Sequence, residues 1–250
     1  MDLGLKGLKA LVTGGTKGIG RRCAEIFADE GASVAVCARN AGDVEDTVAA
    51  LKAKGVTAFG QSVDVADKAA LEAFVAASAK ALGGLDMVVA NVSALAVADD
   101  EEAWAKGFET DLMHTVRLVN AAMPWLEKSA AGSITAISSV SGRETDFTGP
   151  AYGAYKAALV HYMHGLAVKL APQNIRANAV SPGNTYFDGG IWQQIETGNP
   201  DLFAQALALN PTGRMAKPEE VARGVVFLAS PRSGFMTGSE LVVDGGYTAR

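Results

Sequence analysis

The chain has 250 residues, of which 49% are hydrophobic and 20% are charged, and its formal net charge is −5 at pH 7. This length and apolar content predict a single domain over residues 1–250 with a sizeable core. The sequence has neither clustered Lys and Arg nor an apolar run of about 18 residues, so it favours neither a nucleic acid nor a membrane as a partner.

Short apolar runs alternate with amphipathic stretches from the N-terminus onward. Stretches 18–32 and 68–82 have a helical pattern and end near glycine, as helices often do. Apolar runs separated by helices predict parallel strands that are buried on both faces. The predicted fold class is therefore α/β of the Rossmann type, a doubly wound parallel sheet with helices on both faces. The predicted strands are 9–13, 33–38, 57–63, 85–90, 132–138, 175–180 and 240–244.

A glycine-rich turn, TGGTKGIG at 13–20, joins the first predicted strand to the first predicted helix. Glycine permits backbone angles that cost other residues free energy, and it lets backbone amides approach a pyrophosphate at the helix N-terminus. The spacing differs from Gly-x-Gly-x-x-Gly, but the strand–turn–helix context is the same. We expect a dinucleotide cofactor here, in contact with Gly14, Thr16, Lys17, Gly18 and Ile19.

The end of the second predicted strand bears on the choice of cofactor. An acid there would bind the ribose 2′-hydroxyl of NAD, whereas this chain has Ala38 followed by Arg39. An arginine can bind a phosphate through two parallel hydrogen bonds, and Lys17 is a second cation that could reach the same place. The sequence therefore predicts NADP(H), with NAD(H) as the alternative.

Three tyrosines lie in PAYGAYKAALVHYMHG at 150–165, a stretch with a helical pattern. Residues four apart share a face of a helix, so Tyr152 faces Lys156, whereas Tyr155 points about 100° away from the lysine. A nearby ammonium favours the phenolate form of a tyrosine, which suits general acid–base catalysis. We expect Tyr152 to move the proton. Tyr155 is expected to pack on the cofactor side or at a subunit contact, with a substrate contact as the alternative.

Several motifs occur together in this order along the whole chain: TGGTKGIG at 13–20, Asp64 after the third strand, ISSVSG at 137–142, Tyr152-x-x-x-Lys156, SPG at 181–183 and DGG at 244–246. In this combination the chain resembles the short-chain dehydrogenase/reductase family, and within it the 3-oxoacyl-ACP reductase-like enzymes. The resemblance implies a seven-stranded sheet in the order 3-2-1-4-5-6-7. It also implies an oxidoreductase that transfers hydride between a nicotinamide and a ketone or secondary alcohol.

The resemblance also implies roles for individual residues. Alternation along a strand leaves both Ser139 and Ser141 open, and the family's spacing to the tyrosine selects Ser139 to hold the substrate oxygen. Tyr152 would protonate that oxygen, and Lys156 would hold the nicotinamide ribose. Further cofactor contacts would come from Asp64, Val65, Asn91, Pro182, Gly183 and Thr185.

Three positions depart from the family's usual pattern. The family's Asn-Asn-Ala-Gly is Ala-Asn-Val-Ser at 90–93, which questions how closely the backbone at Ser93 approaches a cofactor. The family's asparagine that helps to order a proton-relay water falls at Asp111. We expect Asp111 to be functional and to keep Lys156 charged, with a structural helix residue as the alternative. Tyr155 stands where the family usually has serine.

Residues 182–215 interrupt the alternation and mix glycine and asparagine with aromatic residues. Long insertions in compact domains often form lids, so we expect a substrate lid at about 184–215. A ketone, a 3-oxoacyl thioester, or a cyclic or aromatic ketone would suit the apolar face that its aromatic side chains predict. Arg143 could anchor an anion, although such loop charges are more often solvated. The residues expected to bound the substrate are Leu95, Arg143, Glu144, Phe147, Phe187, Trp192 and Phe203.

Cysteine and histidine do not predict a metal site. Cys23 and Cys37 lack ligand spacing and are expected in the core. His114, His161 and His164 fall in predicted helices without acidic companions at ligand spacing, so we expect them at helix surfaces or a subunit interface.

The principal hypothesis is an NADPH-dependent carbonyl reductase that can also run as an alcohol dehydrogenase. The alternatives are an NAD-dependent enzyme of the same family, a non-catalytic regulator that kept the cofactor fold, and an isomerase or dehydratase. The N-terminus has no signal-peptide pattern, so we expect a cytoplasmic protein. The resemblance implies a homotetramer or a homodimer.

Overall fold

A computed structural model describes residues 2–249. Within them, seven strands pair in the order β3-β2-β1-β4-β5-β6-β7, and every neighbouring pair is parallel. The predicted fold class and strand order are therefore confirmed. The strands are β1 (Lys9–Thr13), β2 (Ser33–Ala38), β3 (Ala58–Ser62), β4 (Met87–Ala90), β5 (Ser133–Ile137), β6 (Arg176–Pro182) and β7 (Glu240–Val243).

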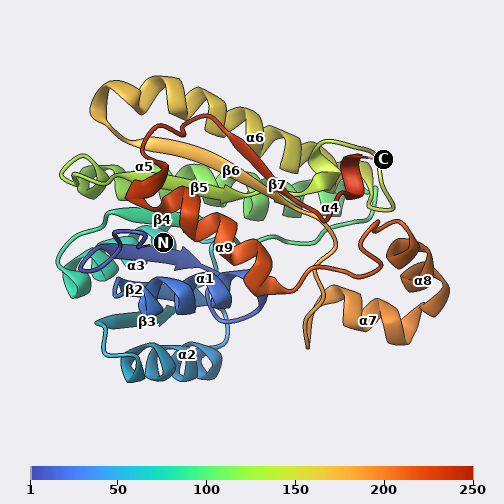
Figure 1. The fold of residues 1–250 in the computed structure, drawn as a ribbon, viewed down its shortest axis with the longest axis horizontal. Coiled ribbons are helices and arrows are strands. Elements are labelled where there is room, and N and C mark those ends of the chain that lie inside the picture. The colour runs from blue at the N-terminus through green and yellow to red at the C-terminus, as the bar shows by residue number, and fades with distance from the viewer. Residues whose placement is uncertain (1, 250) are drawn as a thin grey trace.

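Helices cover both faces of the sheet (Figure 1). They are α1 (Gly18–Asp29), α2 (Ala41–Ala53), α3 (Lys68–Leu82), α4 (Glu101–Gly107), α5 (His114–Leu126), α6 (Pro150–Leu170), α7 (Ile191–Gly198), α8 (Pro200–Ala208) and α9 (Pro218–Ala229). The core on one face joins the sheet to α1, α2 and α9, and the core on the other face joins it to α3, α5 and α6.

The strands are apolar at successive positions because both faces of the sheet are covered. In β1, Leu11 packs toward α3 and α5, whereas Ala10 and Val12 pack toward α1 and α9. Successive side chains of a strand point to opposite faces, so a run without polar positions fits only a sheet that has helices on both sides.

Local capping sets the boundaries of the helices. Asp67 accepts a hydrogen bond from the backbone amide of Ala70 at 3.0 Å and begins α3, and Gly83 ends it with a φ of +77°. The sequence also predicts a helix that opens at Pro218, and α9 begins there. The Glu220 carboxylate caps it by accepting a hydrogen bond from the Lys217 amide at 2.8 Å.

The carboxyl ends of the strands meet at one edge of the sheet, and α7 and α8 lie beyond that edge (Figure 1). At β1 and β4 the strand order reverses direction, and ligands of doubly wound folds bind in the crevice at this switch point. The segment 184–215 includes α7 and α8, so its position suits the predicted lid.

The two cysteines lie in the core, as predicted. Cys23 and Cys37 are both fully buried, and burial raises the pKa of both thiols, that of Cys37 to about 12. No group of three or more His, Cys, Asp or Glu side chains in residues 2–249 is arranged to hold a metal ion. Among the helices of the same residues, none is long and apolar enough to cross a membrane.

The prediction for His114 is wrong, because this histidine is fully buried between α5 and the end of β1. Its Nε2 lies 3.0 Å from Thr13 Oγ1, and its Nδ1 lies 3.2 Å from the Thr110 carbonyl oxygen. Burial lowers the pKa of His114 to about 4, although Thr110 and Asp111 oppose the shift. His161 and His164 are exposed on α6, as expected.

The buried histidine predicts a loss of stability in acid. Between about pH 6.5 and pH 4 the unfolded chain protonates His114 and the folded chain does not, so the free energy of unfolding falls as the pH drops, by up to about 3 kcal/mol. Urea unfolding at pH 7.5 and pH 5 should show that His114→Gln reduces this difference. His161→Gln is the matched control and should leave it unchanged. An equal pH dependence in wild type and His114→Gln would contradict the prediction.

Candidate active site

Three side chains that the sequence suggests for catalysis line one cavity of about 280 Å³. Ser139 follows β5 and begins a short turn, η2 (Val140–Gly142), whereas Tyr152 and Lys156 lie near the start of α6. The Lys156 ammonium lies 5.4 Å from the centre of the Tyr152 ring. Ser138 Oγ donates a hydrogen bond to the Lys156 carbonyl oxygen at 2.7 Å and so ties α6 to the end of β5. The fold therefore brings the serine, tyrosine and lysine together.

Lys156 forms a buried ion pair with Asp111. Nζ lies 3.1 Å from Asp111 Oδ1, and each side chain is only 2% exposed. Nζ also donates a hydrogen bond to the Ile137 carbonyl oxygen at 3.1 Å. Burial alone would lower the pKa of Lys156, but the Asp111 carboxylate and Tyr152 together outweigh burial and raise it. The lysine is thus held in its charged form.

Asp111 reaches this position from a π-helical turn, η1 (Phe108–Met113), between α4 and α5. Its Oδ2 accepts a hydrogen bond from the Ala94 amide at 2.9 Å, and its backbone carbonyl accepts one from the Thr115 hydroxyl at 3.1 Å. Such turns are rare and frequently occur at functional sites. The Asp111 side chain does not line the cavity but lies behind its wall, where it contacts the lining residue Lys156.

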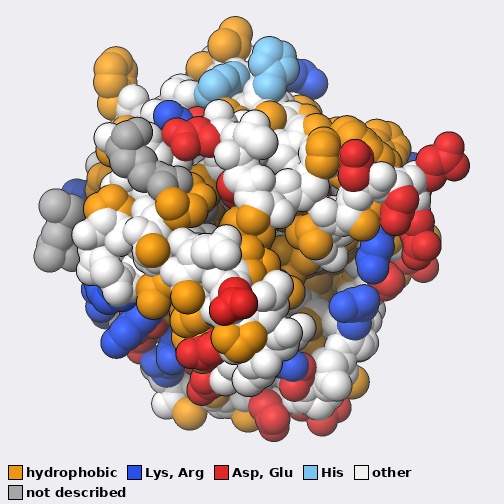
Figure 2. Space-filling view, turned by 90° about the vertical axis from the view of Figure 1, so that its right-hand side faces the viewer, with side chains coloured by type: hydrophobic (Ala, Val, Ile, Leu, Met, Phe, Trp, Pro, Cys, Tyr) orange, Lys and Arg blue, Asp and Glu red, His pale blue; other side chains and the backbone are white. Residues whose placement is uncertain are grey.

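A second cavity of about 560 Å³ adjoins the first, and Lys17, Asn91 and Ser93 line both. The predicted cofactor contacts divide between the two cavities. The second is lined by Gly14, Thr16, Arg39, Asp64 and Val65. The first is lined by Gly18, Ile19, Pro182, Gly183 and Thr185. Figure 2 shows this side of the molecule, where the surface is hollowed over hydrophobic side chains.

The glycine loop has a tight backbone geometry that leaves little room for side chains. Gly14 has a φ of +63°, in the left-handed region that favours glycine. A Cβ on Gly20 would lie 2.2 Å from the Gly14 carbonyl oxygen, so α1 can begin this close to the loop only without a side chain. Asn91 Nδ2 donates hydrogen bonds to the carbonyl oxygens of Thr13 and Gly14, both at 3.2 Å. Asn91 therefore braces the loop, and the loop fits a dinucleotide's pyrophosphate.

The two cations predicted near the adenosine end differ in their partners. Lys17 Nζ lies 2.9 Å from Asp43 Oδ2, at the start of α2. Arg39 is exposed beside the second cavity, and within residues 2–249 its guanidinium forms no ion pair. Of the two, Arg39 is the cation whose charge is not already balanced by an acid.

Apolar side chains wall the substrate end of the first cavity. Leu95, Phe147, Phe187 and Trp192 lie in its lining, as predicted from the sequence. The rings of Phe147 and Trp192 pack edge to face with centres 4.9 Å apart, which joins the loop after Ser139 to α7. The cavity is therefore closed on one side by a segment from the predicted lid.

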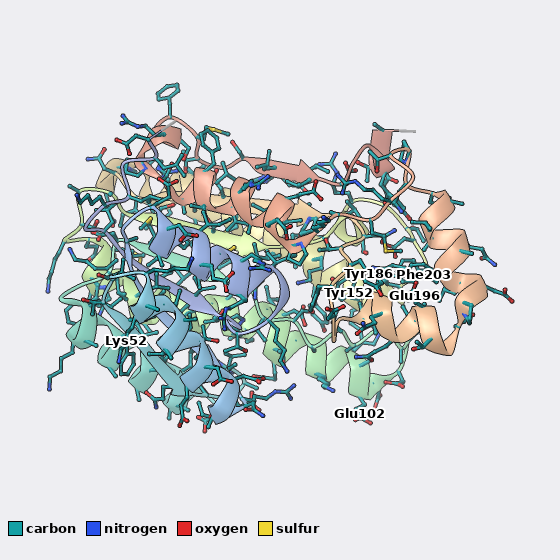
Figure 3. The ribbon with its side chains drawn as sticks, turned by 60° about the horizontal axis from the view of Figure 1, so that its bottom comes forward. Lys52, Glu102, Tyr152, Tyr186, Glu196 and Phe203 are labelled. Carbon is teal, nitrogen blue, oxygen red and sulfur yellow. The ribbon has the colours of Figure 1, made fainter. Side chains whose placement is uncertain are left out.

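The structure contradicts three other predictions about this wall. Arg143 and Glu144 do not line the cavity, and Arg143 Nη1 instead lies 2.8 Å from Glu240 Oε2. Phe203 packs behind the wall against Trp192, with ring centres 6.3 Å apart. Figure 3 shows Phe203 near Tyr186, whose hydroxyl donates to Glu196 Oε2 at 2.5 Å. These contacts stabilise the α7–α8 segment from within.

The lining also includes Ser141, which strand alternation left open beside Ser139, and Asp146, which has no role in the sequence-based prediction. Ser141 Oγ donates a hydrogen bond to Asp146 Oδ2 at 2.5 Å. The sequence gives one reason to expect Asp146 near the site, its position in the loop between Ser139 and Tyr152. The Asp146 side chain places a carboxylate at the substrate end of the cavity.

Tyr155 lies outside the cavity. Its ring packs against Trp104 and Phe108, with ring centres 5.5 and 6.4 Å apart. Gly107 makes room for it, because a Cβ there would lie 2.7 Å from the Tyr155 ring. Tyr155 therefore packs against α4 and η1 of its own chain, and packing on the cofactor side or at a subunit contact stays a prediction.

Comparisons with known proteins cover nearly the whole chain. Residues 14–248 match the family described as "Enoyl-(Acyl carrier protein) reductase". Isoepoxydon dehydrogenase patN of Penicillium expansum is 41% identical over 250 residues, which cover 98% of this chain and 96% of the relative. Cis-4-hydroxycyclohexanecarboxylate dehydrogenase of Sinomonas cyclohexanicum is 35% identical, with 96% of each chain covered.

A solved structure of a reductase has the same fold as this chain. L-Sorbose reductase from Gluconobacter frateurii, complexed with NADPH and L-sorbose, superposes with a TM-score of 0.92 at 31% identity, and the match covers 100% of both chains. A chain of this length and fold therefore has relatives named as dehydrogenases and reductases, one of which was solved with a nicotinamide cofactor.

Proposed function

The chain belongs to the short-chain dehydrogenase/reductase family and is an NAD(P)-dependent oxidoreductase, and we propose that it interconverts a small ketone and the corresponding secondary alcohol. The observation that carries this proposal is the convergence of Ser139, Tyr152 and Lys156 on a cavity that adjoins the glycine loop. The geometry supplies a proton donor and a cation beside the place where a carbonyl oxygen would lie.

The three side chains divide the chemistry between them. A nicotinamide bound along the two cavities would donate or accept the hydride. Ser139 donates a hydrogen bond to the carbonyl oxygen, and Tyr152 gives its proton to that oxygen as negative charge develops on it. In the reverse direction the Tyr152 phenolate takes the proton of the alcohol. The Lys156 ammonium, 5.4 Å from the centre of the Tyr152 ring, stabilises that phenolate.

Asp111 acts in this scheme as a positioning residue. Its carboxylate holds the Lys156 ammonium 3.1 Å away and balances the charge of the lysine. Burial alone would lower the pKa of Lys156, and the Asp111 carboxylate offsets that effect, so the lysine stays charged beside Tyr152.

We assign the cofactor as NADP(H), with NAD(H) as the alternative. The exposed Arg39 guanidinium lies at the mouth of the second cavity without an acidic partner among the described residues. A 2′-phosphate on the adenosine ribose would supply one. The NADPH in the L-sorbose reductase structure supports this choice.

The shape of the cavity favours a small uncharged substrate. A volume of about 280 Å³ is just below the roughly 300–1,000 Å³ of typical ligand pockets. Asp146 would repel an anion, and Arg143 is paired with Glu240 outside the cavity. The relative named for cis-4-hydroxycyclohexanecarboxylate supports a ring skeleton, although the carboxylate of that compound is a group that Asp146 would disfavour here. A compact cyclic ketone therefore fits better than a long acyl thioester.

The association of several copies of the chain stays a prediction. Trp104 and Phe108 are 37% and 42% exposed on α4 and η1, and they pack on Tyr155. Rings that cover one another yet face solvent support a contact between copies, in line with the expected homotetramer or homodimer.

Replacing Tyr152 tests the reaction itself. With NADPH and a panel of cyclic ketones, the wild type should oxidise the cofactor, and Tyr152→Phe should lower kcat by about 100-fold or more because the proton donor is lost. Tyr162→Phe, on the same helix, is the matched control and should retain wild-type turnover. Full activity of Tyr152→Phe would remove the proposed mechanism, and an inactive wild type across the panel would favour a non-catalytic binding protein.

Replacing Arg39 tests the choice of cofactor. Arg39→Asp should raise the KM for NADPH by about 10- to 100-fold, because a charge-assisted hydrogen bond is replaced by repulsion, and it should lower the KM for NADH. Arg223→Asp makes the same change of charge on the exposed face of α9 and should alter neither value. An unchanged KM for NADPH in Arg39→Asp would refute the assignment.

Replacing Asp111 with the amide tests its positioning role. In Asp111→Asn the carboxylate no longer offsets burial, so the pKa of Lys156 should fall and the loss of alcohol oxidation at high pH should begin at a lower pH than in the wild type. Glu102→Gln removes an exposed carboxylate far from Tyr152 (Figure 3) and should leave the pH profile in place. A profile of Asp111→Asn that overlays the wild type would show that the carboxylate is structural only.

A further inference from the structure

A chain of hydrogen bonds leads from the catalytic serine to a carboxylate in the cavity wall. Ser139 Oγ donates to Ser141 Oγ at 3.1 Å, and Ser141 Oγ donates to Asp146 Oδ2 at 2.5 Å. The other oxygen, Asp146 Oδ1, accepts hydrogen bonds from the Thr148 amide and hydroxyl at 2.8 and 2.6 Å. The carboxylate is thus fixed in orientation, with Oδ2 turned toward the two serines.

The direction of this chain follows from the donors and acceptors available. An ionised carboxylate only accepts, so Ser141 must donate its single proton to Asp146. The Ser141 oxygen then acts as an acceptor for the hydrogen bond that the Ser139 hydroxyl donates. The short distance between Ser141 and Asp146 is typical of a charge-assisted bond, which keeps that direction.

The proposed reaction needs the same Ser139 proton for the substrate carbonyl oxygen. When Ser139 turns its hydroxyl to the substrate, the Ser141 oxygen loses its donor inside a half-buried cavity. An unsatisfied polar atom in such a place is costly. A substrate that brings its own donor to Ser141 therefore binds better than one that does not.

We propose that Ser141 and Asp146 form a subsite for a hydroxyl group on the carbon next to the reacting carbonyl. The substrate is then an α-hydroxyketone, or a vicinal diol in the direction of oxidation. The two serine oxygens lie 3.1 Å apart, about one hydrogen-bond length, and the carbonyl and hydroxyl oxygens on adjacent carbons can lie at a similar spacing. This inference rests on the proposed carbonyl reduction and adds the class of substrate.

The rest of the cavity suits such a molecule. Its remaining walls include Leu95, Phe147 and Trp192, which would cover the carbon skeleton. The hydroxyl donates to Ser141, whose bond to the carboxylate makes the serine oxygen a stronger acceptor. A hydroxyl is uncharged, so it meets Asp146 without the repulsion that an acidic group would suffer.

A matched pair of substrates tests the subsite. Oxidation of NADPH is followed with 2-hydroxycyclohexanone and with cyclohexanone, and the ratio of their kcat/KM values is measured. The wild type should prefer the hydroxyketone by about tenfold or more. Ser141→Ala and Asp146→Asn should both reduce this ratio toward one. Binding of NADPH, measured by its fluorescence, shows that each variant is folded.

Two control variants come from the same loop. Thr145→Ala removes a hydroxyl and Glu144→Gln removes a carboxylate, and both residues are exposed outside the cavity, so the ratio should stay at the wild-type value. Equal kcat/KM values for the two ketones in the wild type would overturn the subsite alone. A loss of activity in Asp146→Asn that is equal for both ketones would also overturn it, because the carboxylate would then only hold the loop. Absence of turnover with either ketone would overturn the proposed function and the subsite with it.

Discussion

The buried ion pair between Lys156 and Asp111 is the contact on which the geometry of the site depends. Through the Lys156 ammonium it joins α6 to the end of β5 at Ile137, and through the second oxygen of Asp111 it joins η1 to the loop after β4 at Ala94. Two charges at 2% exposure are tolerable only as a pair, since removal of one partner leaves a charge without solvent. The ion pair therefore fixes α6, which carries the proposed proton donor Tyr152, to the loop after β4 by electrostatics as well as by packing.

The fold could be predicted from the sequence because the hydrophobic pattern, the helix-end residues and the helical spacing all indicate the same structure. The strand β4 is apolar and buried at every position, so its sequence fits between two layers of helices and not at a surface. Glycine and proline mark the ends of helices at Gly83 and Pro218. Helical spacing likewise predicted that Tyr152 and Lys156 lie together, because residues four apart on a helix keep that relation in any tertiary structure.

Two of the failures share a physical cause, which is that the partner of the residue lies far away in the sequence. Arg143 was considered as an anion anchor, but its partner is Glu240, on β7 and 97 residues further along the chain. The residues around His114 have an ordinary helical pattern, and His114 is buried only because α5 packs against Thr13. Asp146 could not be assigned to the cavity because a loop has no periodicity from which a direction could be inferred.

The net charge of the side chains changes from positive to negative along the two joined cavities. This difference favours one orientation of the proposed cofactor and substrate. The adenosine end has the unbalanced guanidinium of Arg39, which suits a ligand with phosphates. The middle has Lys156 balanced by Asp111, which adds no net charge where hydride transfer is proposed. The far end has the carboxylate of Asp146, which disfavours phosphates and suits a donor of hydrogen bonds. This distribution of charge supports the proposed arrangement, in which the anionic cofactor occupies one end and a hydroxylated neutral substrate the other.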